Sequence, residues 1–344
     1  MASSLPSPEL AQQIWVYGSS RLLPLAAALL IANVLYRFFF HPLARVPGPW
    51  LAKSTSLWTL FHSYVGDEAT LISSYHFPDS RTHHPVVRVG PNEVTISDGA
   101  ALAPIYSEKG GFKKADCYKN FDIDGWPSLF SQTEKDKRAT RAKAVVGLFS
   151  TKSLKDGEER LGGCVKNYIN RFQREKEAAR KTGKEVNVLN LARSLAVDVV
   201  TAYLFKRSYG GLEEDFYTGE RDVEKAKSVQ MSASEFVNAF VGVGRFLYLP
   251  NWSFVLLEKV LEYLFESPET VESMSKVDRF LKSVVNSADA QGADSETYQG
   301  RMLKAGITPD EVVAQCKDLM FAGTDSSGTN LSTFCWQLAK NPAV

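Results

Sequence analysis

Apolar and small residues recur every three or four positions through residues 308–342, and this spacing predicts one long helix. The recurring positions are Val312, Cys316, Leu319, Met320, Gly323, Ser327, Leu331, Phe334 and Leu338. Thr308 is the expected N-cap, Glu311 is its expected partner in a capping box, and Asn341-Pro342 end the pattern. At about 1.5 Å per residue, such a helix spans about 45 Å.

The middle of this helix reads FAGTDSSGTN (321–330), which is a poor helix-forming sequence. Each helical glycine costs about 1 kcal/mol relative to alanine, and Ser, Thr and Asp compete with the backbone for hydrogen bonds. Two interpretations stay open at this point. In one, the small residues let a neighbouring helix approach closely. In the other, Ala322 and Gly323 leave room for a flat cofactor, and Asp325 and Ser326 supply a proton path.

The remaining pattern predicts a mainly helical chain with one β-hairpin. Residues 85–98 place β-branched residues on both sides of Gly90-Pro91-Asn92, which predicts the hairpin, and Asp98 is expected to cap a short helix over 99–106. Apolar spacing predicts further helices over 133–149, 152–180, 189–206, 229–248, 252–266 and 270–288. Loops rich in glycine and charge are expected at 207–221 and 289–301.

The N-terminal segment has a different pattern. Residues 22–40 are almost entirely apolar, with Arg37 as the single charge, and the run is long enough to cross a bilayer. No convincing cleavage site precedes the folded region, which favours an uncleaved anchor over a signal peptide. Residues 41–50 contain three prolines and predict a stiff, extended hinge.

These features divide the chain into a lumenal segment (1–21), a transmembrane anchor (22–40), a proline-rich hinge (41–50) and one body (51–344). Basic residues follow the apolar run more often than they precede it, so the positive-inside rule places the body in the cytosol. In a eukaryotic cell, the expected location is the cytosolic face of the endoplasmic reticulum membrane.

Composition excludes several classes of function. Among 344 residues, 40 basic and 39 acidic side chains give a net charge of +1, which does not favour nucleic-acid binding. The four cysteines lie far apart and form no Cys/His cluster, so no zinc site or disulfide framework is expected. Residues 135–143 (KDKRATRAK) are basic; they form either a solvated face or, through Arg138 and Arg141, a grip for an anionic group.

The order of these features resembles the fungal microsomal branch of the cytochrome P450 family, the haem-thiolate monooxygenases. The matching features are the anchor, FHPLARVPGPW (40–50), the hairpin, the basic helix ending in LFS, and the AGTDSS helix. The resemblance implies a long helix across the oxygen-binding face of a haem. At Ala322 and Gly323, the porphyrin and O2 would approach the helix backbone. It also implies that Asp325 and Ser326 form the acid–alcohol proton relay, although the family usually has threonine at the second position.

The same resemblance implies that Arg138 or Arg141 binds a haem propionate. It further implies an iron-ligating cysteine in a loop of the form FxxGxRxCxG. None of the cysteines here fits that loop, and the family's downstream ExxR helix is absent. The resemblance therefore predicts a cytochrome P450-like fold that is C-terminally incomplete, without an axial thiolate and inactive alone. The cysteines concerned are Cys117, Cys164, Cys316 and Cys335.

The complete enzyme would use haem, O2 and electrons from an NADPH-linked reductase to oxidise a small lipophilic substrate, with fungal secondary metabolism as a plausible setting. The alternative is a non-catalytic, membrane-anchored helical protein that binds a partner or a hydrophobic ligand. A hydrolase is not favoured, because GTDSSG (323–328) is not GxSxG and no strand precedes it.

Overall fold

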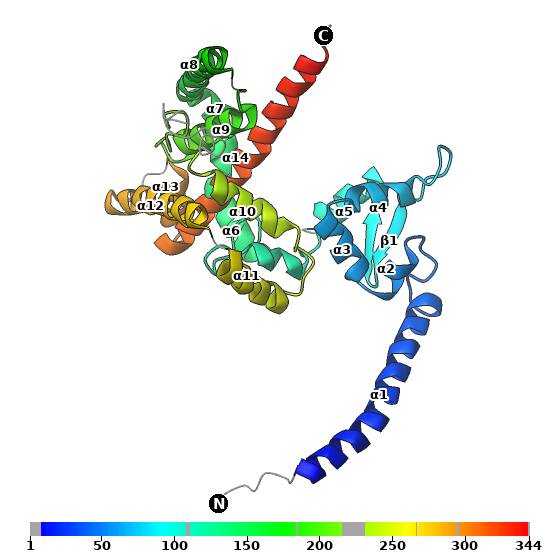
Figure 1. Cartoon of the computed structure of the whole chain (residues 1–344). Coiled ribbons are helices and arrows are strands. Elements are labelled where there is room, and N and C mark those ends of the chain that lie inside the picture. Colours follow the sequence, from blue (N-terminus) through cyan, green and yellow to red (C-terminus); the bar gives the residue numbers. More distant parts are fainter. Residues whose placement is uncertain are drawn as a thin grey trace, which may run out of the picture. The chain divides into compact units, whose positions relative to one another are not determined.

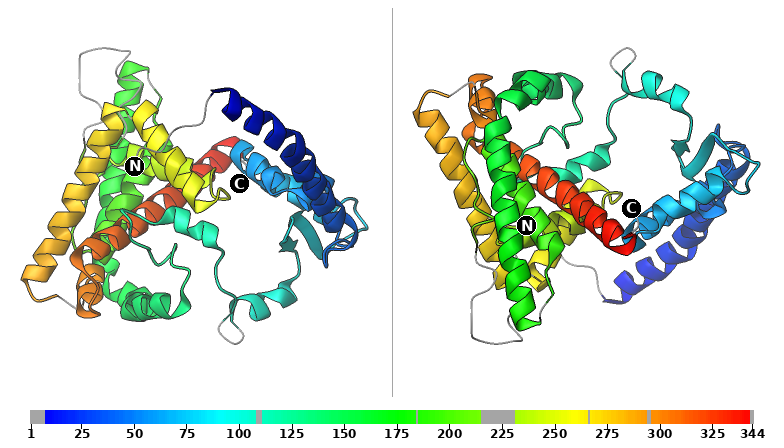
Figure 2. Two further views of the ribbon diagram at one scale, coloured as in Figure 1. Left: turned by 90° about the horizontal axis from the view of Figure 1, so that it is seen from below. Right: turned by 90° about the horizontal axis from the view of Figure 1, so that it is seen from above.

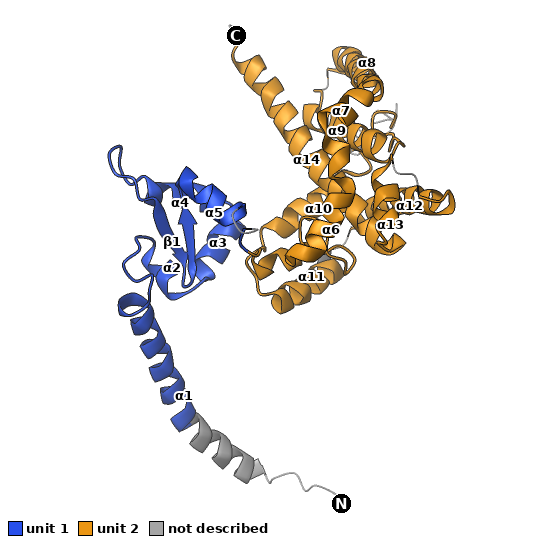
Figure 3. Cartoon of the chain, turned by 180° about the vertical axis from the view of Figure 1, so that it is seen from behind, with its two compact units in different colours: residues 1–112 blue, residues 113–344 orange. Residues whose placement is uncertain are grey.

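The computed structural model describes residues 8–107, 111–183, 185–214, 231–265, 267–293 and 296–342. The chain forms two compact units, residues 1–112 and residues 113–344 (Figure 3). Within these described residues both units are mainly helical, and the first contains a two-stranded antiparallel sheet, so the expected fold class is confirmed (Figure 1).

The first unit contains the expected hairpin. Val86 pairs with Ile96 and Val87 with Thr95, and Val87 is completely buried. Asp98 accepts a hydrogen bond from the N–H of Ala100 at 2.9 Å, which confirms its predicted role as a cap. The elements of this unit are α1 (Pro8–Phe39), α2 (Trp50–Ser54), α3 (Leu57–Val65), α4 (Glu68–His76), β1 (Val86–Gly90), β2 (Glu93–Ile96), η1 (Gly99–Ala101) and α5 (Leu102–Tyr106).

The proline-rich segment is not the extended connector that its composition predicts. Residues 40–46 form turns, and the carbonyl of Pro47 accepts a hydrogen bond of 2.7 Å from the N–H of Arg88 in β1. Gly48 has φ +151°, and a Cβ there would lie 2.1 Å from the Arg88 carbonyl oxygen. Only glycine permits this approach. The segment is therefore packed on the hairpin, because backbone contacts outweigh the intrinsic preference of proline for extended structure.

The second unit is built around α14 (Pro309–Lys340), which packs along α9 and also contacts α10, α12 and α13 (Figure 2). Its core includes Val197, Val277, Val312 and Met320, each fully buried. The other elements are η3 (Asp116–Phe121), α6 (Lys135–Val145), η4 (Val146–Phe149), α7 (Thr151–Asp156), α8 (Glu158–Thr182), α9 (Val188–Leu204), α10 (Ser234–Gly244), α11 (Asn251–Phe265), α12 (Pro268–Ala290) and α13 (Tyr298–Lys304).

The helices differ from the sequence-based prediction in several places: α2, α3 and α4 were not predicted, and the helix expected over 133–149 is divided into α6 and η4. The helix expected over 152–180 is divided at Gly157, where a Cβ would lie 2.7 Å from the ring of Tyr203 on α9. The loop expected over 289–301 contains the start of α13, which Thr297 caps by accepting a hydrogen bond from the N–H of Gly300 at 3.1 Å. Of the helix expected over 229–248, residues 229 and 230 lie outside the described residues.

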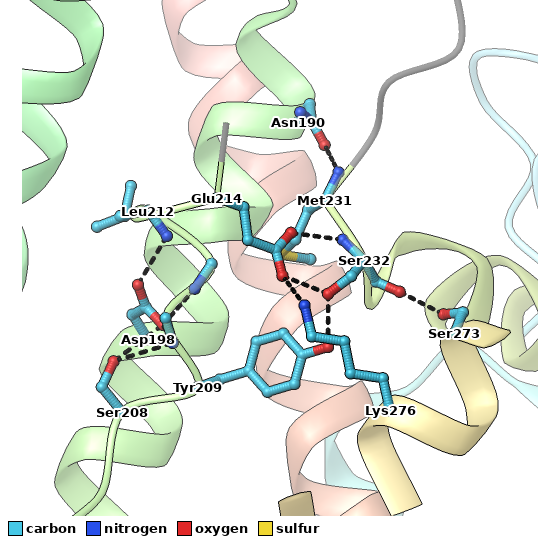
Figure 4. Close-up of polar contacts among 12 residues, drawn as sticks. Asn190, Asp198, Ser208, Tyr209, Leu212, Glu214, Met231, Ser232, Ser273 and Lys276 are labelled. Carbon is cyan, nitrogen blue, oxygen red and sulfur yellow. Dashed lines mark hydrogen bonds and ion pairs between the residues drawn. The ribbon is translucent and has the colours of Figure 1, made fainter. Parts of the chain in front are cut away.

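A buried carboxylate orders the loop that follows α9 (Figure 4). Asp198 is 4% exposed and accepts backbone hydrogen bonds from Gly210 at 2.7 Å, Gly211 at 2.9 Å and Leu212 at 2.9 Å. The hydroxyl of Ser208 donates a fourth hydrogen bond at 3.0 Å. These charge-assisted bonds compensate the desolvation of the carboxylate. Asp198 is thus a structural residue that fixes the loop on α9.

Glu214 forms a second cluster beside this loop (Figure 4). Its carboxylate pairs with the ammonium group of Lys276 at 2.5 Å and accepts a 2.7 Å hydrogen bond from the N–H of Ser232. The hydroxyls of Ser232 and Tyr209 lie 2.7 Å apart. The cluster links three segments that are distant in sequence, and burial raises the pKa of Tyr209 well above its ordinary value.

Candidate active site

The long helix is continuous through its glycine-containing middle. α14 runs from Pro309 to Lys340 with Thr308 at the N-cap, as predicted. The predicted capping box is wrong, because Thr308 makes no side-chain cap and Glu311 points elsewhere. Its carboxylate lies 2.5 Å from the guanidinium of Arg141 on α6, and both side chains are almost completely buried. A tertiary ion pair therefore replaces the local cap.

The first half of α14 is buried on all sides over residues 311–316. The Gln315 side chain accepts a hydrogen bond from the N–H of Leu129 at 2.9 Å and donates one to the carbonyl of Pro127 at 2.8 Å. Farther along, the ammonium group of Lys317 lies 2.8 Å from Asp278. These contacts fasten α14 to the segment before α6 and to α12.

The glycines in the second half serve helix packing. A Cβ at Gly323 would lie 2.4 Å from Cγ2 of Val200, and a Cβ at Gly328 would lie 2.6 Å from Cγ of Arg193. Both neighbours belong to α9. At Gly323, the first of the two interpretations therefore holds: the glycine lets a neighbouring helix approach closely. The structure does not place Gly323 on the face that carries Ala322.

The opposite face of the second half is open. Ala322 and Ser326 are exposed and lie one turn apart, and Thr329 continues the same face. The Ser326 hydroxyl donates a hydrogen bond of 2.6 Å to the carbonyl of Ala322. Small side chains on consecutive turns make this face shallow. The second interpretation, a flat cofactor beside Ala322, stays a prediction.

Asp325 is directed toward α9. Its carboxylate pairs at 2.6 Å with the guanidinium of Arg193, whose other amino group donates to Asn238 at 3.0 Å. Arg193 Nε is buried and has no hydrogen-bond partner among the described residues. Asp325 and Ser326 are thus neighbours in sequence that make separate contacts. Sequence analysis missed Arg193, although it is the single basic residue of α9.

The two candidate arginines of α6 have different environments. Arg141 is committed to Glu311 by an ion pair of 2.5 Å. Arg138 is exposed, and its Nε donates to the carbonyl of Leu129 at 3.2 Å. The ammonium group of Lys114, which sequence analysis did not identify, donates to the next carbonyl, that of Phe130. The geometry therefore makes Arg138 the better placed of the two arginines for an external anion.

Two of the four cysteines are buried. Cys316 is fully buried in the core, and burial raises the pKa of its thiol well above the ordinary value. Burial also raises the pKa of Cys164, on α8. A reactive or ligating cysteine instead needs an accessible, readily formed thiolate. Among the described residues, no group of three or more His, Cys, Asp or Glu side chains is arranged to hold a metal ion.

Among the described residues, one helix has the length and composition of a membrane span. Residues Ser20–Phe39 have a mean hydropathy of 1.9, and none of this stretch is buried against the rest of the chain. The span agrees closely with the predicted run of residues 22–40.

Comparison with known proteins gives the class to which this fold and helix belong. The family model for cytochrome P450 matches residues 80–344. The chain belongs to the cytochrome P450 family, whose members carry haem.

Individual relatives are fungal enzymes. The chain is 36% identical over 94% of its length to cytochrome P450 monooxygenase mfmF of Annulohypoxylon moriforme, of which it covers 66%. It is 24% identical over 95% of its length to cytochrome P450 monooxygenase tazI of Aspergillus terreus, covering 64% of that protein. It is 25% identical over 90% of its length to pisatin demethylase of Fusarium vanettenii, covering 58%. The chain thus spans about two thirds or less of these relatives.

Proposed function

We propose that this chain forms the oxygen-facing part of a haem-dependent monooxygenase that oxidises a small lipophilic molecule. The open face of Ala322 and Ser326 on α14 is the observation that carries the proposal. Haem, when bound, supplies the activation of O2 for insertion into substrate. The names of the relatives, which include a demethylase and several fungal monooxygenases, support a substrate from fungal secondary metabolism.

The chain's own residues have distinct roles in this proposal. Ala322 keeps the face low so that a planar group can lie on it. The Ser326 hydroxyl, now bonded to the Ala322 carbonyl, reaches the face by rotation about χ1 and can pass a proton there. Serine lacks the methyl group that restricts χ1 in threonine, so this rotation is easy. The ion pair with Arg193 orients the carboxylate of Asp325, the other member of the proposed relay.

Arg138 is the proposed contact for a haem propionate, because guanidinium binds carboxylates through paired donors. Arg141 has a positioning role through Glu311. No cysteine of this chain is proposed as an iron ligand, because none of the four lies in a sequence of the form FxxGxRxCxG, and the thiols of Cys316 and Cys164 are also buried and hard to ionise. The chain alone is therefore proposed to be inactive.

The proposal extends to location and partner. The apolar helix ending at Phe39 anchors the chain in the endoplasmic reticulum membrane, with the rest facing the cytosol. An NADPH-linked reductase supplies the electrons there. Protease protection of the chain in microsomes tests the orientation, since cytosolic exposure predicts digestion of residues 113–344 without detergent.

Haem titration of the full chain in detergent micelles, followed by absorbance, tests the cofactor proposal. Ser326→Phe should block binding because the ring covers the open face. Ser287→Phe is the matched control: Ser287 is an exposed serine of α12 that also donates to the carbonyl four residues earlier, at 2.6 Å. Equal haem binding by both variants would contradict a site on α14.

Charge at the same site is tested by Arg138→Ala. Losing a hydrogen bond to a charged group costs about 1.5–3 kcal/mol, so haem affinity should fall roughly tenfold or more. Arg245→Ala, at an exposed arginine after α10, should have no effect. If the wild-type chain binds no haem at all, the non-catalytic binding protein becomes the better description. A thiolate-type spectrum of the reduced CO complex would contradict the assignment of the cysteines.

A further inference from the structure

A cavity of about 580 Å³ lies in the first unit, where α4 meets the end of β2. From α4, its lining includes Glu68, Ile72 and His76, which are spaced four residues apart and therefore share one face of the helix. From the hairpin, Ile96 and Ser97 complete the lining. Sites for small molecules have volumes of roughly 300–1,000 Å³. The cavity is therefore large enough for a small organic ligand.

His76 holds α4 against the hairpin at this cavity. Its side chain is 5% exposed. The Nδ1–H group donates to the carbonyl of His84 at 2.6 Å, and Nε2 lies 2.9 Å from the hydroxyl of Thr95 on β2. Because a carbonyl only accepts, the neutral ring carries its proton on Nδ1 and accepts at Nε2. Both ring nitrogens thus have partners in the fold, and the two sides of the cavity are fixed to each other.

The cavity is acidic where α4 begins. Glu68 is the first residue of α4 and belongs to the lining. Glu93, the first residue of β2, has its pKa raised by desolvation and by the nearby charge of Glu68. A positive charge placed beside two carboxylates favours the ionised form of both. Among the described residues that line the cavity, none is lysine or arginine. The electrostatics therefore favour a cation over an anion.

Apolar side chains lie toward the other end of the cavity. Ile72 is one turn beyond Glu68, and Phe77 and Ile96 are 54% and 42% exposed. The Phe77 ring stacks on the ring of His83, with centroids 4.8 Å apart and planes within 8°. At about 1.5 Å per residue, the distance along the helix from Glu68 to Phe77 is about 13 Å. This arrangement fits an elongated molecule with one charged end and an apolar body.

We propose that this cavity binds a lipophilic amine, with its ammonium group beside Glu68 and its apolar body against Phe77 and Ile96. Charge complementarity selects the ammonium group, because hydrogen bonds between ionised partners are roughly twice as strong as neutral ones. Burial of the apolar body supplies further affinity. All lining residues lie within 68–97, in the first unit, whereas α14 belongs to the second. The amine site is therefore separate from the proposed haem site.

Isothermal titration calorimetry of the full chain in neutral detergent micelles tests the site. The probe is 4-phenylbutylamine, and 4-phenylbutanol is its uncharged analogue. Titration into micelles without protein measures partitioning and supplies the baseline. The amine should bind more tightly than the alcohol by about tenfold or more, since only the amine forms a charged hydrogen bond. Equal affinities for the two probes, or no binding of the amine, would overturn the proposal.

Glu68→Gln tests the charged end of the site. The variant keeps the size of the side chain and should weaken amine binding about tenfold while leaving alcohol binding unchanged. Glu158→Gln is the matched control, because Glu158 is also the first residue of a helix, α8, and is exposed. Amine affinities that are equal in wild type and Glu68→Gln would show that the amine binds elsewhere.

Ala69→Phe tests the cavity itself, because Ala69 belongs to the lining and a phenyl ring there fills the space. The variant should lose binding of both probes. Ala103→Phe, at an exposed alanine of α5, should bind them as the wild type does. Circular dichroism establishes that each variant is folded; if Ala69→Phe is not, Glu68→Gln decides alone. Wild-type binding by folded Ala69→Phe would contradict a site at α4.

Discussion

The two halves of α14 use opposite means to stay in place. In the first half, Glu311 and Gln315 are buried and receive specific polar partners from other elements. In the second half, Gly323 packs against α9 through the absence of a side chain, while Ala322 and Ser326 remain exposed. Packing of the second half is therefore one-sided.

This difference explains the composition of the helix. A helix enclosed on all sides gains from larger side chains and from polar groups whose partners are fixed. A helix that must pack on one side and remain accessible on the other needs small residues on both faces. The poor helix propensity of residues 321–330 is compensated by close contact with α9 on the packed side.

The largest expected effect is the loss of the buried ion pair of the first half. Glu311→Ala leaves Arg141 buried and uncompensated, and breaking such a pair costs about 3–5 kcal/mol. Chemical denaturation of the full chain measures this change. The double variant Arg141→Met, Glu311→Leu should recover most of the stability, because neither buried charge remains. Equal stability of Glu311→Ala and the wild type would show that the pair contributes little.

The next effect concerns the packed side of the second half. Gly323→Ala places a methyl group against Val200 and should destabilise the fold by about 1–3 kcal/mol, despite better helix propensity. Combining it with Val200→Ala should restore part of the loss.

Gly163→Ala on α8 is the control for this substitution, since nothing lies within 4 Å of a Cβ there. That variant should gain up to about 1 kcal/mol from propensity alone. A similar gain for Gly323→Ala, measured by denaturation, would refute the close packing of α14 on α9.

A smaller, pH-dependent effect is expected at Asp318, near the junction of the two halves. Desolvation raises the pKa of its carboxyl above the ordinary value of 3.8, although hydrogen bonds from Ser128 and Phe130 and the nearby charge of Lys114 oppose the shift. The folded chain therefore binds this proton more tightly than the unfolded chain. The contribution of this group to the free energy of unfolding is fully present below pH 3.8. It is lost as the pH rises through the raised pKa of the folded chain.

Asp318→Asn removes that titration. The variant should be more stable than the wild type near neutral pH, and the gap should narrow as the pH is lowered. Denaturation at a series of pH values measures the difference. A gap that widens with acidification would show that the hydrogen bonds, rather than desolvation, dominate.

The smallest effect is expected on the open face. Ser326→Ala removes an exposed hydroxyl and should change stability by no more than about 0.5 kcal/mol. Haem affinity should also remain, because the smaller side chain keeps the face low. A large loss of stability, measured by thermal unfolding, would show that this face is packed rather than open.

Much of the architecture was predictable from periodicity alone. The long helix, the hairpin and the Asp98 cap all rest on contacts within a few residues, which local sequence determines. The predicted capping box at Thr308 failed for the opposite reason. Glu311 instead pairs with Arg141, which is 170 residues away in the sequence. This long-range ion pair takes the place of the local hydrogen bonds of the capping box.

The site was predictable in part. Sequence identified the unusual composition of residues 321–330, the basic helix, and the four residues singled out on α14. The sequence did not show that Gly323 is covered and Ala322 exposed. Adjacent helical residues differ by about 100° in direction, and only the position of α9 decides which of the two it covers. It did not pair Asp325 with Arg193, which requires two helices to be aligned in register.

The sequence by itself determined most of the helical segments after residue 133, which segment can span a membrane, and where small and charged residues are concentrated. The reason is that spacing, propensity and length act locally along the chain. Only the tertiary structure decided which face of α14 is packed, which arginine of α6 remains available, and that His76 holds α4 against the hairpin. Those outcomes depend on side chains brought together from distant parts of the sequence, where burial and pairing set the free energy.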